Sequence, residues 1–212
     1  MRLILGNAMT RRIAGLVLFI GLPILLAVLA YTRLNRYQPY GTALLTPRPA
    51  AEFTLASASN PSYRLSDLRG KAVFIFFGFV NCPDVCPTTL QDLKRVYTRL
   101  TPEEQARVQV LFISVDPERD TPEALGRYVQ FFDPHFVGLS GTPEATAQVA
   151  KDYGVFYQKS QIKSAQQYNV DHTASVFLID PKGQLRLIYG QGKLQQDPDK
   201  VVQDVRWLLK GS

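Results

Sequence analysis

The stretch that decides the fold is KAVFIFFGFVNCPDVCPTTL, residues 71–90. Residues 71–80 form an almost unbroken apolar run, which predicts a strand buried on both faces of a sheet. The sequence NCPDVCP, residues 81–87, follows at once, and apolar residues then recur at helical spacing over residues 88–100 (Leu90, Leu93, Val96, Tyr97 and Leu100). The pattern therefore predicts a buried strand, a short loop that carries both cysteines of the chain, and a helix.

Strand and helix patterns alternate after this stretch. We expect strands over residues 108–115, 136–139, 175–179 and 185–189, and helices over residues 121–132, 143–153 and 199–210. The turn Asp180-Pro181-Lys182-Gly183 joins the last two strands as an antiparallel pair. The order β-α-β-α-β-α, hairpin, helix predicts an α/β fold with a central mixed sheet flanked by helices, as in thioredoxin-like proteins.

An apolar segment precedes this domain. Residues 13–30, IAGLVLFIGLPILLAVLA, carry no charge and predict one N-terminal transmembrane helix, since 18 helical residues span about 27 Å of a hydrocarbon core ~30 Å thick. Three arginines before the segment and two after it favour residues 1–12 in the cytoplasm. A cleaved signal peptide is the alternative, although its apolar core is usually ~7–15 residues long. We expect a linker over residues 31–49 and the folded domain over residues 50–212.

The charge of the chain supports this topology. The formal net charge is +6, but residues 1–36 hold five arginines and no acid, and the remaining 19 basic and 18 acidic residues nearly cancel. A nucleic-acid binder carries its basic residues on the folded part, so we expect no nucleic-acid partner. Only 12 residues precede the apolar segment, which favours a bacterial inner membrane with the folded domain in the periplasm over a mitochondrial targeting sequence.

The two cysteines form a reactive pair in this interpretation. Cys82 and Cys86 lie four residues apart, and a disulfide that closes so short a loop removes little entropy from the unfolded chain. The start of a helix presents unpaired N–H groups that favour thiolates, so we expect at least one of the thiols, with both favoured, to be partly ionised near neutral pH. Pro87 suits the first position of the helix. Thiolates attack disulfides and bind soft metals.

His172 is the candidate third ligand. It lies just before the strand expected at residues 175–179, in the loop that runs beside the cysteine loop in a thioredoxin-like fold. Residues 169–180 contain no proline that would fill this space. Two thiolates and one imidazole suit Cu(I), and could hold Cu(II) with an added oxygen ligand. A structural zinc site is disfavoured because it needs four ligands at finger spacing.

Three motifs resemble those of the Sco/SenC family: the CPDVCP loop at residues 82–87, the segment SVDPERDTPE at residues 114–123, and Asp171-His172-Thr173. The resemblance covers about residues 50–210. It implies a membrane-anchored, thioredoxin-like protein that helps to assemble the dinuclear copper site of cytochrome c oxidase subunit II. It also implies that Cys82, Cys86 and His172 are the copper ligands.

Two functions remain open at this point. The first is a copper-binding assembly factor that works by ligand exchange with subunit II. The second is an exported thiol–disulfide oxidoreductase that reduces the cysteines of that subunit, and it needs the cysteines but not His172. An oxidising exterior would close the Cys82–Cys86 disulfide, which cannot bind copper, so we also expect a thioredoxin-like reductant as a partner.

Three further polar residues can be weighed. We expect Asp120 and Thr121 to cap the helix over residues 121–132. Asp116 follows a buried strand at the edge of the sheet where α/β proteins carry their sites, so it either faces the site or fixes the turn. His135 is expected to be a loop residue without a metal role.

Overall fold

The computed structural model describes residues 21–34, 37–164 and 167–211. The chain divides into two compact units, Met1–Gln38 and Pro39–Ser212. In the first unit the described element is helix α2, Leu22–Leu34. Residues 13–20 of the predicted transmembrane segment lie outside the described residues. Within the described ranges, no helix combines the length and the apolar character that crossing a membrane requires.

The second unit is built on a six-stranded sheet in the order β1-β10-β9-β4-β5-β6. Strands β4, β5 and β6 are parallel, whereas β9, β10 and β1 join by antiparallel pairing. The sheet is therefore mixed, as predicted. The strands are β1 (Thr42–Pro49), β4 (Ala72–Gly78), β5 (Val108–Ser114), β6 (Val137–Leu139), β9 (Val176–Ile179) and β10 (Gln184–Tyr189).

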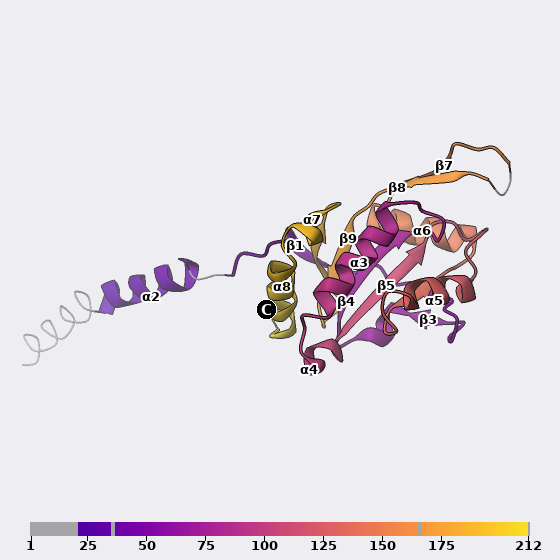
Figure 1. Cartoon of the computed structure of the whole chain (residues 1–212). Helices are drawn as coiled ribbons and strands as arrows, with labels where there is room; N and C mark the ends of the chain where they lie inside the picture. Colours follow the sequence, from indigo (N-terminus) through magenta and orange to yellow (C-terminus); the bar gives the residue numbers. More distant parts are fainter. Residues whose placement is uncertain (1–20, 35–36, 165–166, 212) are drawn as a thin grey trace, which may run out of the picture. The chain divides into compact units, whose positions relative to one another are not determined.

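Helices cover both faces of this sheet, because alternate residues of the buried strands point to opposite sides. On one face, Phe74 and Phe76 of β4 pack in a core with residues of α3, α5 and α8. On the other face, Ile75 and Phe77 pack with residues of α6 and of the 3-10 helix η2. Figure 1 shows α3 lying across the sheet beside α8. The helices are η2 (Leu65–Leu68), α3 (Val85–Tyr97), α4 (Pro102–Gln105), α5 (Pro122–Gln130), α6 (Pro143–Tyr153), α7 (Lys193–Gln196) and α8 (Pro198–Leu209).

The folded unit begins earlier than expected. Residues 42–49, which were predicted to belong to the linker, form the edge strand β1 and pair with β10. Its prolines, Pro47 and Pro49, are compatible with this place, since an edge strand need not donate every N–H to the ladder. Just before β1, the buried carboxylate of Asp204 accepts hydrogen bonds from the Tyr40 and Gly41 N–H groups at 2.9 and 2.8 Å. The expected boundary at residue 50 therefore moves to about Pro39.

Two other expectations differ from the structure. Helix α3 begins at Val85, so Pro87 is its third residue and not its first. The helix tolerates it there, since the first N–H groups of a helix have no partner within it. Short strands that the sequence did not predict are β2 (Thr54–Leu55), β3 (Tyr63–Arg64), β7 (Tyr157–Ser160) and β8 (Asn169–His172). Of these, β7 and β8 form a hairpin that projects beyond the main sheet (Figure 1).

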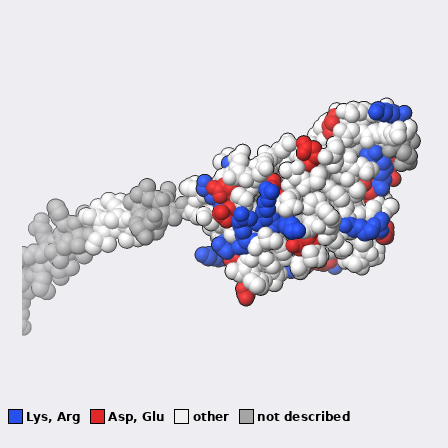
Figure 2. Space-filling model, viewed as in Figure 1, with Lys and Arg blue, Asp and Glu red and all other residues white. Residues whose placement is uncertain are grey.

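Basic side chains gather over α3 and α8 on the face shown in Figure 2, with acidic side chains among them. Two ion pairs involve residues of α8: Asp199 with Arg99 at 3.1 Å and Arg206 with Glu104 at 2.8 Å. This pairing agrees with the near balance of charge outside residues 1–36.

Candidate metal centre

The cysteine loop lies at the carboxyl end of β4, where the chain turns into α3. Cys86 is fully buried and Cys82 is partly exposed. Cys86 can lie against β4 because Gly78 has no side chain: a Cβ atom there would lie 2.5 Å from the Cys86 Sγ and 2.6 Å from the Phe112 ring. Gly78 was not singled out from the sequence. Its signal was a glycine within an otherwise bulky buried strand, which often marks such a close approach.

The structure brings together the three residues predicted to form the site. The Sγ atoms of Cys82 and Cys86 and a ring nitrogen of His172 all lie within 4.8 Å of one another. The Cys86 Sγ and the His172 Nε2 are 3.5 Å apart. His172 is the last residue of β8. These are the only three His, Cys, Asp or Glu residues among those described that form a group able to hold a metal ion.

The surroundings of His172 orient its ring toward the thiols. Its Nδ1 lies 3.2 Å from the Thr173 carbonyl oxygen, which can only accept a hydrogen bond. Nδ1 can donate to this oxygen, and Nε2 is the ring nitrogen that faces the thiols and that a neutral imidazole would offer to a metal. The rings of Phe76 and Phe79 lie 6.2 and 5.9 Å from the imidazole, measured between ring centroids, and limit its tilt.

The two thiols differ in ionisation. The Cys86 thiol donates a hydrogen bond to the Cys82 sulfur, and this bond is the main reason why the pKa of Cys82 falls to about 4. Hydrogen bonds from His172 and from the backbone N–H groups of Asp84 and Cys86 also lower it. The hydrogen bond between the two sulfurs, followed by burial, raises the pKa of Cys86. The free protein thus holds one thiolate and one thiol, and the expectation that both are partly ionised is wrong for Cys86. The reason is that the two sulfurs share one proton.

We expect Cys82 to react with iodoacetamide at a nearly constant rate between pH 8 and pH 5, because its thiolate persists down to a pKa of about 4. The rate should fall only as the pH approaches that value. In the unfolded chain the rate should instead fall about tenfold per pH unit below the ordinary thiol pKa. Mass spectrometry of the singly alkylated protein checks the site of modification, and the Cys82→Ser variant is the control. If the alkylation rate of the folded protein also fell tenfold per pH unit below pH 8, the assignment of Cys82 as a thiolate would be wrong.

A hollow of about 250 Å³ opens beside the thiols. The cysteine loop supplies one wall through Pro83 and Val85, and the end of β8 with the residues after it supplies the other through Asp171 and Ala174. A ligand or a partner residue can therefore reach the site from solvent between the loop and the hairpin.

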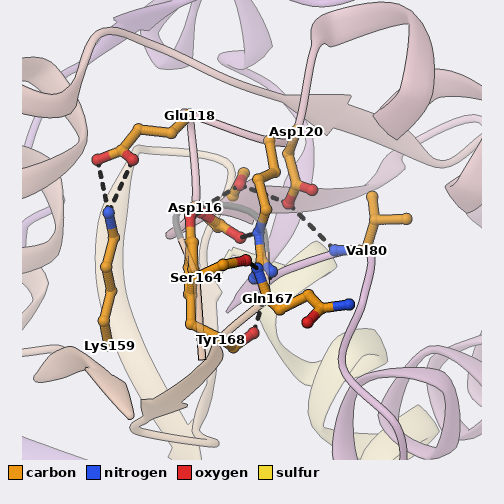
Figure 3. A network of polar contacts seen from close by, with 10 residues as sticks. Val80, Asp116, Glu118, Asp120, Lys159, Ser164, Gln167 and Tyr168 are labelled. Carbon is orange, nitrogen blue, oxygen red and sulfur yellow. Dashed lines mark hydrogen bonds and ion pairs between the residues drawn. The ribbon is translucent and has the colours of Figure 1, made fainter. Parts of the chain in front are cut away.

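Asp120 does not cap α5, contrary to the expectation from the sequence. The Thr121 side chain alone accepts from the Ala124 N–H at 3.2 Å. The Asp120 Oδ2 instead accepts from the Ser114 hydroxyl at 2.7 Å and from the Val80 N–H at 3.1 Å (Figure 3). Burial raises the pKa of this carboxyl. Asp120 thereby fixes the residues that lead from β4 into the cysteine loop.

The remaining two candidates lie apart from the thiols. Asp116 is buried, and its side chain contacts Arg119 and Tyr168. Neither Arg119 nor Tyr168 was weighed from the sequence, and Tyr168 carried no signal there. His135 lies in the loop before β6, where its Nδ1 is 2.9 Å from the Asp133 Oδ1.

Comparison with known proteins identifies relatives of the whole domain. The model of the SCO1/SenC family matches residues 43–210. The mitochondrial SCO2 homolog of Bos taurus is 43% identical over 129 residues, which make up 60% of this chain and 48% of that protein. The chain thus spans about half the length of curated relatives such as this one.

Solved structures agree with this match. The solution structure of apo Sco1 from Thermus thermophilus is 50% identical, with a TM-score of 0.74, and covers 82% of this chain and 99% of that one. The structure of Bradyrhizobium japonicum ScoI with copper bound is 36% identical, with a TM-score of 0.68, and covers 76% and 99% of the two chains. With a matching domain, a shared thioredoxin-like fold and the cysteine–histidine site in place, the chain belongs to the SCO1/SenC family.

Proposed function

We propose that this protein binds one copper ion between Cys82, Cys86 and His172, and that it passes the ion to the dinuclear copper site of cytochrome c oxidase subunit II. The observation that carries the proposal is the convergence of two sulfur atoms and one imidazole nitrogen within 4.8 Å of one another. Soft thiolates and a single imidazole form a low-coordinate set that Cu(I) prefers. Copper bound in the relative from Bradyrhizobium japonicum supports the choice of metal.

The site needs little rearrangement to accept the ion. Cys82 is already a thiolate, and only the Cys86 proton must leave when copper binds. The His172 Nε2 already faces the sulfurs, 3.5 Å from the Cys86 Sγ. The hollow beside the thiols leaves room for a donor group from a partner, so copper can move by exchange of one ligand at a time.

The cellular setting is part of the proposal. Residues 13–30 anchor the chain in a bacterial inner membrane, residues 1–12 lie in the cytoplasm, and the folded domain lies in the periplasm. The uncharged run of residues 13–30 and the flanking arginines support this topology. A thioredoxin-like reductant keeps Cys82 and Cys86 reduced there.

The test is copper binding by the full-length protein, purified in detergent and reduced under anaerobic conditions. We expect one Cu(I) per chain, and a loss of about a hundredfold in Cu(I) affinity for His172→Ala, because the third ligand is removed. Competition with a chromophoric Cu(I) chelator measures both. The matched control is His135→Ala, which removes the other histidine and should bind copper as the wild type does. Failure of the reduced wild-type protein to bind Cu(I) stoichiometrically would end the proposal.

One observation favours a second function. A partly exposed thiolate at Cys82, paired with a buried thiol at Cys86, is the arrangement of a thiol–disulfide oxidoreductase, in which the first sulfur attacks and the second resolves. Such a protein would reduce the cysteines of subunit II. Under this alternative, His172→Ala should leave dithiol–disulfide exchange with a model peptide largely unchanged, and the wild type should oxidise stoichiometrically with the peptide.

A further inference from the structure

His172 reaches the thiols from a hairpin that is not part of the main sheet. Among the described residues, strands β7 and β8 pair only with each other, from Tyr157 opposite His172 to Ser160 opposite Asn169. A two-stranded hairpin of this size has little stability of its own. Contacts between the hairpin and the rest of the domain must therefore set the position of the imidazole.

The main polar contact comes from the segment that follows β5. Arg119 is almost buried, with 8% of its side chain exposed, and its Nε donates to the Asp116 Oδ2 at 2.5 Å. Its Nη1 donates to the Tyr168 carbonyl oxygen at 3.0 Å. The guanidinium also lies over the Tyr168 ring, 3.6 Å from the ring centroid. Arg119 thus binds the backbone and the side chain of the residue just before β8.

Tyr168 also contacts Asp116, and so links the hairpin side to both residues of the segment after β5. Its hydroxyl donates to the Asp116 Oδ1 at 2.6 Å, and the 1% exposed side chain of Asp116 therefore receives one donor on each oxygen (Figure 3). Burial, followed by the hydrogen bond to Asp116, raises the pKa of Tyr168, so the hydroxyl keeps its proton. Asp116 itself is fixed through its N–H, which donates to the Ser114 hydroxyl at 2.9 Å. A second pair, Lys159 with Glu118 at 2.7 Å, is exposed and contributes less.

We propose that Asp116, Arg119 and Tyr168 form a clasp that positions His172 against the thiols, so that Arg119 and Tyr168 are positioning residues for copper. Tyr168 is four residues from His172, and the hairpin pairing from residue 169 to residue 172 transmits its position directly. The clasp joins the hairpin to the same segment that fixes the cysteine loop through Asp120 and Val80. One short segment, residues 114–120, therefore holds both walls of the site in place. This inference rests on the proposed copper site.

The test is a double-mutant cycle on Cu(I) affinity in the full-length protein, measured by chelator competition. Tyr168→Phe removes one hydroxyl and should weaken binding severalfold; Arg119→Lys loses the planar fork and the ring contact and should weaken it about tenfold. In the His172→Ala background neither substitution should change the affinity further, because the clasp acts through the imidazole. An equal loss in both backgrounds would show a merely structural role, and no loss in the wild-type background would also overturn the clasp.

A matched control separates positioning from general stability. Arg186→Lys alters an ion pair of similar burial, Arg186 with Asp180 at 2.8 Å, whose arginine lies over the Trp207 ring. Asp180 follows β9, whereas the site lies before that strand, so this variant should keep the wild-type copper affinity. The imidazole NMR signals of His172 give a readout without metal: they should shift or broaden in Tyr168→Phe and stay unchanged in Arg186→Lys. Unchanged signals in Tyr168→Phe would overturn the clasp, and absence of copper binding by the wild type would overturn only the proposed function.

Discussion

The Gly78→Ala variant is expected to lose about 2–3 kcal/mol of unfolding free energy, because overpacking a buried strand forces neighbours out of their places. The added Cβ would lie 2.5 Å from the Cys86 Sγ and 2.6 and 2.9 Å from two atoms of the Phe112 ring. Both neighbours are fully buried, so either can shift only by straining the core around it. The sulfur is the smaller group, and its displacement would disturb its 3.5 Å approach to the His172 Nε2. Copper affinity should therefore fall at least tenfold along with stability.

Chemical denaturation and chelator competition measure the two effects of Gly78→Ala. The control is Gly190→Ala, since a Cβ at Gly190 would meet no atom within 4 Å. That variant should be as stable as the wild type within about 0.5 kcal/mol. If Gly78→Ala kept the stability and the copper affinity of the wild type, the position of Cys86 would not depend on the absence of a side chain at residue 78.

The Asp204→Ala variant is expected to lose about 3 kcal/mol or more, because each buried donor left without its acceptor costs about 1–3 kcal/mol. The fully buried carboxylate accepts from the Tyr40 N–H, the Gly41 N–H and the Tyr189 hydroxyl at 2.7–2.9 Å. These groups attach the start of the folded unit to α8. Removing the acceptor should release the residues before β1 as well as lower the unfolding free energy.

Denaturation and amide hydrogen exchange check this variant, with faster exchange expected at Tyr40 and Gly41. Asp199→Ala is the matched control on the same helix. The side chain of Asp199 is 76% exposed and pairs with Arg99, whose side chain is also exposed to solvent. An exposed pair of this kind contributes about 0–1 kcal/mol. Equal losses for the two variants would contradict the role assigned to Asp204.

The sequence predicted the elements whose signal is local. The apolar run of residues 71–80 and the helical spacing after it predicted β4 and α3, although α3 begins and ends three residues earlier than expected and its first turn contains Cys86. The Thr-Pro-Glu starts at Thr121 and Thr142 placed α5 and α6 to within two residues, because each threonine accepts from an N–H of its own helix. His172 could be placed near the thiols only through the order of the elements, which brings the start of β9 beside the carboxyl end of β4.

The elements that the sequence did not predict depend on partners far away in the chain. Strand β1, TALLTPRP, contains two prolines and no alternation, and it is a strand only because β10 lies beside it. The hairpin strands YQKS and NVDH are mostly polar, and contacts such as the Arg119–Tyr168 pair hold them. Asp120 stands where a cap is expected, but Thr121 already fills that role, so the carboxylate is free to bind Val80.

The unequal exposure of the two sulfurs decides the sequence of events at this centre. Cys86 is sealed beneath the loop, and Cys82 borders the opening. An incoming disulfide, oxidant or metal acceptor meets the outer sulfur first, and the inner one can respond only afterwards. A trapped mixed adduct with any partner should therefore carry its covalent link on residue 82.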